Sequence, residues 1–271
     1  MIPEQVVENR CGRLPPKTFD KPKDLARPPT HKIESPKMIS LMAIAEVNAQ
    51  AIVLLASKNY ESAIELLSAA LRVVMQLSAD SMQNDAAAAD EMPLNWSTFS
   101  LDSDGGDFST VVAPMATSSL ILPFRSALTF RPSTSTEMQA SEPSLEMASL
   151  TLLYNLALAF QLKGCQDIQA QHRCFDKAAK IYRMMLQRLH RLQYVMDASS
   201  RGFYSLCVWN NLACVHEERQ EYDIVRNCVE NMQCILDETI MPFASPHDEH
   251  FFVWNVWLYQ SLPWFPFAAA A

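Results

Sequence analysis

One pattern of apolar residues occurs three times along this chain, and no other feature restricts its fold as strongly. The three copies span residues 47–70, 153–185 and 209–232. In each copy a run with helical spacing leads to a short break, and the break ends in an aromatic residue that opens a second helical run. These aromatic residues are Tyr60, Phe175 and Tyr222. A hairpin of two such helices cannot bury its apolar face alone, so the repeat predicts an all-α stack of hairpins.

The second and third copies contain the most regular stretches, LYNLALAFQLKG and VWNNLACVHEERQEYD. Each contains Asn-Leu-Ala near its start and has an aromatic residue or His three positions after the alanine. This pattern resembles the tetratricopeptide repeat (TPR), with Trp209 at the family's leading Trp and Gly164 at its turn glycine. The resemblance covers roughly residues 42–76 and 147–240, and the order of the pieces is similar to a group of TPR-like proteins from diatoms.

Several residues depart from the TPR pattern. Lys58 and Gln220 stand where the family has its turn glycine, and Val225 stands where Ala is usual. The stretch CQDIQAQHR is inserted before Phe175, and we expect this insertion, with His172 and Cys174, to form an exposed loop. The resemblance therefore implies an irregular TPR-like array of about three hairpins plus a C-terminal helix.

Composition divides the chain into five segments. They are a disordered Pro-rich arm over 1–37, a TPR-like hairpin over 38–79, an acidic, low-complexity and mostly disordered insert over 80–143, TPR-like hairpins 2 and 3 over 144–240, and a capping helix with an apolar tail over 241–271. Within the insert, residues 108–132 are apolar and rich in β-compatible side chains, which favours an extended path over the helices rather than a hairpin. An alternative is that they occupy the groove of the array until they are displaced.

The composition also argues against several classes of ligand and location. Five glycines, with no G-x-G-x-x-G or G-x-x-x-x-G-K stretch, argue against a nucleotide phosphate loop. A formal net charge of −8 argues against nucleic acid as a partner. Seven cysteines with no signal peptide before them indicate reduced thiols in the cytoplasm or nucleus. No run predicts a transmembrane span, although the uncharged residues 251–271 leave open a capping role or an interfacial membrane contact.

A His-Glu pair, His216 and Glu217, raises the question of a metal site. The zinc motif H-E-x-x-H requires a second His four residues after the first, and this chain has Gln220 there. Cys207 and Cys214 share a helix face, but their spacing is not that of a structural zinc site. His216 also takes the aromatic position of the repeat, so we interpret it as a packed side chain. We expect no catalytic residue, no cofactor and no metal, and therefore no enzyme activity.

In TPR proteins, peptides lie along the concave face of the first helix of each hairpin. The matched frame places these residues on that face: Asn48, Ile52, Leu55, Tyr154, Leu158, Gln161, Asn210, Cys214, Glu217 and Glu218. None is Lys or Arg, so the frame predicts an apolar groove with an acidic edge rather than a basic clamp for an acidic C-terminus. We therefore expect a protein-binding scaffold or adaptor whose partner presents a helix or an apolar, basic segment. The alternatives are the regulatory part of an enzyme system, a cryptic enzyme or a self-associating protein, and the oligomeric state stays open.

Overall fold

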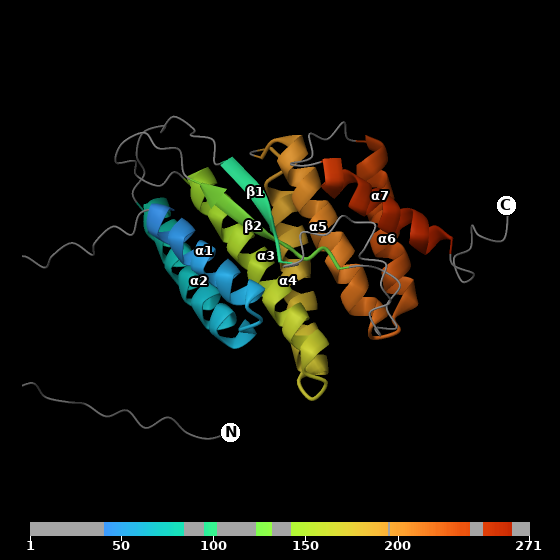
Figure 1. Ribbon diagram of the computed structural model, residues 1–271. Coiled ribbons are helices and arrows are strands. Elements are labelled where there is room, and N and C mark those ends of the chain that lie inside the picture. The colour runs from blue at the N-terminus through green and yellow to red at the C-terminus, as the bar shows by residue number, and fades with distance from the viewer. Residues whose placement is uncertain are drawn as a thin grey trace, which may run out of the picture. The chain divides into compact units, whose positions relative to one another are not determined.

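Helices and one pair of strands make up the described part of the chain, which in the computed structural model comprises residues 41–83, 95–101, 123–131, 142–194, 196–238 and 246–261. The helices are α1 (Leu41–Ala56), α2 (Tyr60–Gln83), α3 (Glu142–Gln166), α4 (Gln171–Arg191), α5 (Ala198–Glu217), α6 (Tyr222–Glu238) and α7 (Pro246–Gln260). The strands are β1 (Asn95–Ser100) and β2 (Ser126–Arg131) (Figure 1). The all-α prediction is confirmed. The predictions for residues 1–37 and for the tail 262–271 lie outside the described residues.

The helices pack as hairpins in chain order. α1 packs with α2, α3 with α4 and α5 with α6, and successive hairpins meet through α2 and α3 and through α4 and α5, with α7 packed on α6 (Figure 1). Ala63 on α2 and Ala178 on α4, each three residues after the aromatic residue that opens its copy of the repeat, are fully buried. Because small side chains let helix axes approach to about 8–10 Å, these positions permit the close packing of each hairpin.

The turn of the second hairpin differs from its prediction. Gly164 lies inside α3 rather than at a turn, and a Cβ added to it would lie 2.7 Å from Cε1 of Phe175. Glycine is therefore required by the close approach of the Phe175 ring. The insertion expected to form a loop instead lengthens both helices, since α3 continues to Gln166 and α4 begins at Gln171. Cys174 is consequently buried, while His172 remains exposed as predicted.

The aromatic residues that open the second helices do not share one environment. Phe175 is buried, Tyr60 is half-buried and Tyr222 is exposed. An aromatic ring therefore fills the space between helices in the second hairpin but not in the third. In the third hairpin Val225, which corresponds to Ala63 and Ala178, is fully buried.

Two non-glycine residues close helices in the left-handed backbone conformation. Lys58 and Gln220 both have φ of 61°. The Lys58 N–H donates to the carbonyl of Leu55 and the Asn59 N–H donates to the carbonyl of Leu54, which is the pattern of a Schellman cap. After α5 the same pattern recurs, because the Gln220 N–H donates to the carbonyl of Glu217 and the Glu221 N–H donates to the carbonyl of His216. The residues that depart from the TPR turn glycine thus adopt the conformation that glycine favours.

Replacing Lys58 or Gln220 by glycine should therefore raise the free energy of unfolding by about 1 kcal/mol per site, because a Cβ is unfavourable at positive φ. Urea titration of each variant would measure the change. Lys58→Ala is the control, since it removes the same side chain but keeps the Cβ, and it should leave stability nearly unchanged. A loss of stability in both glycine variants would contradict the left-handed caps.

α3 is the central helix of the described array. Its residues 151–159 are all buried, with α2 and α4 on its flanks and β2 lying against it. A stretch of this helix, Leu145–Gln166, is long and apolar enough to span a membrane, but 83% of its most apolar window is buried within the protein. Burial on all sides accounts for this composition without a membrane.

β1 and β2 form an antiparallel pair inside the segment predicted to be a mostly disordered insert. The register places Thr98 opposite Leu128, and the pairing extends to a hydrogen bond from the Leu101 N–H to the Arg125 carbonyl. β2 packs on α1 and α3 (Figure 1). The expected extended path over the helices is present for residues 123–131, here called the strand segment. Its partner strand, β1, lies outside residues 108–132, so the pairing is not the short hairpin considered within that stretch.

Candidate functional site

The residues predicted to line the groove lie on the first helices of the three hairpins, α1, α3 and α5, and their shared surface is here called the inner face. Nine of the ten side chains are buried, and Glu218, directly after α5, is half-buried. The inner face is not open, because the strand segment lies against it. β2 contacts α1 and α3, and Phe124 contacts α5 and α7 through hydrogen bonds and ring contacts.

Asn155 on α3 holds the main chain of β2 at Leu128. Its Oδ1 accepts a hydrogen bond from the Leu128 N–H at 2.8 Å, and its Nδ2 donates to the Leu128 carbonyl at 2.8 Å. Nδ2 of Asn48 on α1 donates to the same carbonyl at 2.9 Å, and Oδ1 of Asn48 accepts a hydrogen bond from Nδ2 of Asn155 at 2.8 Å. Both main-chain polar groups of Leu128 are therefore satisfied by side chains of the inner face.

Asn211 on α5 holds the main chain of Phe124 in the same way. Its Oδ1 accepts from the Phe124 N–H at 2.7 Å, and its Nδ2 lies 3.1 Å from the Phe124 carbonyl. The Tyr154 hydroxyl donates to that carbonyl at 3.2 Å and accepts from Asn211 at 3.1 Å. A carboxamide presents both an acceptor and a donor, so it can hydrogen-bond to the N–H and the C=O of one residue of an extended chain. Such a pair of hydrogen bonds from one asparagine side chain is here called a grip.

The two grips are consistent with the geometry of an extended chain. Phe124 and Leu128 are four residues apart, and alternate residues of a strand direct their N–H and C=O groups to the same edge. The two gripped residues are thus separated by roughly 13 Å along the chain. One edge of the strand segment faces the asparagines, while the other edge pairs with β1.

The ring of Phe124 fills an aromatic pocket between α5 and α7. Its centroid lies 6.1 Å from Phe203 in an edge-on arrangement, 5.3 Å from Phe251 and 4.9 Å from Phe252. The side chain is 3% exposed. Aromatic pairs at these separations add to the stabilisation from burial alone, so Phe124 is the main apolar anchor of the strand segment.

Further asparagines continue the polar network toward α7. Asn210 donates to Asn211 at 3.2 Å and accepts from Asn255 on α7 at 2.7 Å. On the opposite side, the Tyr182 hydroxyl donates to Gln161 at 2.9 Å. Asn210 and Gln161, two of the predicted groove residues, therefore hydrogen-bond to neighbouring side chains of the helical array.

Two of the predicted groove residues, Asn48 and Tyr154, hydrogen-bond to the strand segment. The residues that bond to both main-chain groups of Leu128 and of Phe124 are Asn155 and Asn211, which the predicted frame left out. Their signal was visible in the sequence, because each opens the Asn-Leu-Ala start of a matched stretch. Ile52, Leu55, Leu158 and Cys214 are core residues.

The two residues predicted to form an acidic edge lie at the C-terminal end of α5, where Glu217 is buried and Glu218 is half-buried. Burial raises the pKa of Glu218, and the neighbouring Glu217 raises it further. Burial also raises the pKa of the Cys165 thiol to about 11, with Glu218 acting in the same direction and Arg125 in the opposite one.

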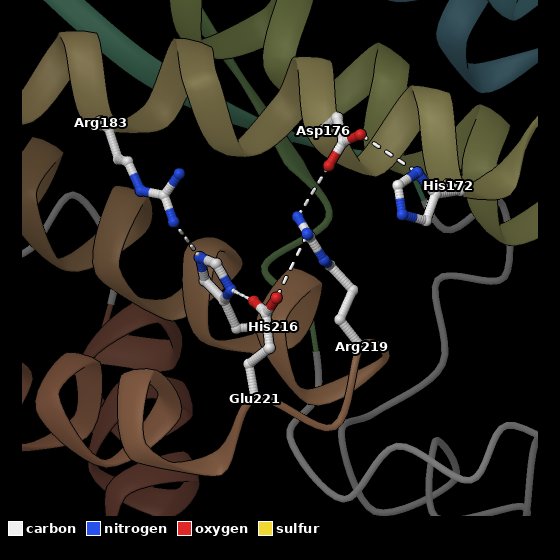
Figure 2. Close-up of polar contacts among 6 residues, drawn as sticks. All are labelled: His172, Asp176, Arg183, His216, Arg219 and Glu221. Atoms are coloured by element: carbon white, nitrogen blue, oxygen red, sulfur yellow. Dashed lines mark hydrogen bonds and ion pairs between the residues drawn. The ribbon is translucent and has the colours of Figure 1, made fainter.

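His216 is a packed side chain held by two charged residues, as Figure 2 shows. An N–H of Arg183 lies 3.0 Å from Nε2 of His216, and Nδ1 of His216 bonds to the carboxylate of Glu221. Because arginine can only donate, Nε2 is the acceptor and Nδ1 carries the hydrogen. Arg219 extends the network to Asp176 at 2.8 Å and Glu221 at 3.2 Å, and His172 pairs with Asp176 (Figure 2). This network links the α4 helix to the α5–α6 hairpin.

The stability of the fold should fall as the pH drops below about 6.5, in part because of His216. Burial lowers the pKa of His216 below 6.5, Glu221 opposes this shift, and Arg183 adds to it. As the pH falls, His216 is therefore protonated in the unfolded chain before it is protonated in the folded chain. Its contribution to the free energy of unfolding is fully present above pH 6.5 and is lost at lower pH by at most about 1.4 kcal/mol per pH unit. His216→Phe keeps an aromatic ring and should show a shallower dependence in urea titrations at pH 7.5 and 5.5. If the free energy of unfolding changed equally with pH in the wild type and in the variant, His216 would not contribute to the pH dependence.

The buried thiols have the character of core side chains. Burial raises the pKa of Cys228 to about 12 and raises those of Cys207 and Cys214 well above the usual value. Activated cysteines show the opposite shift. In the described ranges, no three His, Cys, Asp or Glu side chains form a group that could hold a metal ion.

Comparison of the chain with protein-family models, with curated proteins and with solved structures finds no significant match. The inner face and the segment that lies on it are therefore the features from which a function can be inferred.

Proposed function

We propose that this protein is a non-catalytic, TPR-like helical-repeat scaffold or adaptor that binds a partner protein through an extended peptide on the inner face of α1, α3 and α5. The observation that carries the proposal is the pair of grips on the main chain, Asn155 on Leu128 and Asn211 on Phe124. The inner face holds a nine-residue segment of its own chain in the form that a bound peptide would take.

The main-chain grips explain how one face can accept a peptide from another protein. Hydrogen bonds to N–H and C=O groups depend on the extended conformation and only weakly on the side chains. If the face were left empty, its apolar side chains would be exposed to water, so an occupant that covers them is favoured. The bound form is a strand, which favours an extended peptide over the helix that the sequence also allowed.

Charge and thiol chemistry support two further parts of the proposal. Glu217 and Glu218 at the end of α5, together with the absence of Lys and Arg from the predicted groove residues, favour an apolar or basic partner over one with an acidic tail. The six cysteines among the described residues are free thiols, which fits a reducing compartment, the cytoplasm or the nucleus.

Affinity capture with the full-length chain tests this function. A peptide of residues 123–131 is added as competitor, and Asn211→Ala and Met75→Ala variants are captured in parallel. Met75 is exposed on α2, away from the inner face, and serves as the matched control. We expect a partner whose capture is abolished by the peptide and by Asn211→Ala but not by Met75→Ala. Partners that are insensitive to both the peptide and Asn211→Ala would reject the inner face as the binding surface.

A further inference from the structure

We propose that the partner binds through an extended segment with phenylalanine at its first position, leucine four residues later and phenylalanine two residues after that, and that this segment replaces residues 124–130. The inference rests on the proposed function and specifies which peptides the inner face selects. It follows from the strand segment, whose side chains already fill the surface that a partner would use.

The first position requires an aromatic side chain. The Phe124 ring lies within 6.1 Å, centroid to centroid, of three other rings, which come from two helices. A smaller residue would leave a cavity between Phe203 and Phe252, and a polar one would lose its hydration without a partner. The Asn211 grip fixes the main chain at this residue, so the ring cannot shift to a neighbouring position.

The following apolar positions are restricted by complete burial. Leu128 is 0% exposed and Phe130 is 4% exposed, so both side chains contribute buried apolar surface. Ala127 is 0% exposed as well, and a larger residue before the leucine would overpack the site. The Asn155 grip fixes the position of the leucine relative to the first phenylalanine.

The remaining positions tolerate variation. Arg125, Ser126 and Thr129 are half-buried, so their side chains reach solvent. The motif therefore sets no requirement at these three positions.

The direction of the bound segment is also determined. Phe124 is held by α5 and α7, and Leu128 is held by α3 and α1, so the chain runs from the third hairpin toward the first. A partner in the same direction would pair antiparallel with β1, as β2 does. β1 thus supplies a second row of main-chain hydrogen bonds, which is recognition by strand addition.

Titration of a labelled nonapeptide, PFRSALTFR, into the full-length chain carrying Phe124→Ala tests the motif. This variant weakens the chain's own segment, which otherwise competes at an effective concentration on the order of millimolar. Phe124→Ala or Leu128→Ala in the peptide should weaken binding by about 100-fold or more. Thr129→Ser in the peptide is the matched control and should bind as the parent does.

Hydrogen exchange on the wild-type chain keeps the inference testable if the Phe124→Ala chain does not fold. Excess parent peptide should accelerate exchange of the chain's own residues 123–131, and the peptide with Phe124→Ala should not. If peptides of unrelated sequence bind equally well and Asn211→Ala abolishes their binding, the motif is wrong although the proposed function stands. If no peptide binds the variant or alters exchange in the wild type, both are overturned.

Discussion

Replacing Phe124 by alanine should lower the free energy of unfolding by about 3–5 kcal/mol, one of the two largest effects expected of a single substitution here. The ring is 3% exposed and contacts Phe203, Phe251 and Phe252, so truncation removes a fully buried side chain and leaves a cavity between α5 and α7. Relaxation of the pocket is restricted, because the Phe124 main chain is held by Asn211. Chemical denaturation of the wild type and the variant measures the loss.

Tyr194→Ala is the matched control for this change. Tyr194 is 90% exposed, so the same type of truncation should alter stability by no more than about 0.5 kcal/mol. A loss below about 1 kcal/mol for Phe124→Ala would show that the strand segment is not packed against the helices in solution. Such a result would remove the basis for the motif.

Replacing Asn211 by alanine should lower the free energy of unfolding by about 2–4 kcal/mol, because it leaves buried polar groups without partners. The Phe124 N–H loses the acceptor at 2.7 Å, and the hydroxyls of Tyr154 and Tyr182 lose a donor within 3.3 Å. The Phe124 carbonyl keeps its bond from Tyr154, so the loss does not extend to every group. Urea titration provides the value, with Asn227→Ala at an exposed position of α6 as the control.

A double variant that combines Phe124→Ala with Asn211→Ala tests whether both residues stabilise the fold by holding the strand segment in place. If Phe124 and Asn211 both act by seating the strand segment, the loss in the double variant should fall short of the sum by about 0.5–3 kcal/mol. Once the segment has detached, the second substitution has little further to remove. Additive losses would mean that Asn211 stabilises the helices independently of the strand segment.

The helices were largely predictable because their signals are local. Apolar residues at helical spacing, and the aromatic residue that follows each short break, marked the hairpins. The boundaries were less predictable. Nothing local distinguishes a loop from two lengthened helices at residues 165–173, and the close contact between Gly164 and Phe175 that favours the helices depends on how α3 packs on α4.

The candidate site was only partly predictable, because its partners lie far apart in the sequence. Spacing within the repeat placed Asn48, Tyr154 and Asn210 on the inner face, and all three are buried there. It did not indicate that Asn155 and Asn211 would each grip a residue of the strand segment. Asn211 and Phe124 are 87 residues apart, and no local pattern connects them.

The sequence by itself determined the all-α class, the three hairpins and the absence of basic residues from the predicted groove frame, since periodicity and residue type are properties of short stretches. Only the tertiary structure decided that residues 95–100 pair with 126–131 and that the inner face is occupied. The same holds for the contact of His216 with Arg183 on α4, 33 residues earlier in the chain. The physical reason is common to all of these cases. Long-range strand pairing and side-chain grips gain their free energy only when distant segments have been brought together, so no single stretch of the chain encodes them.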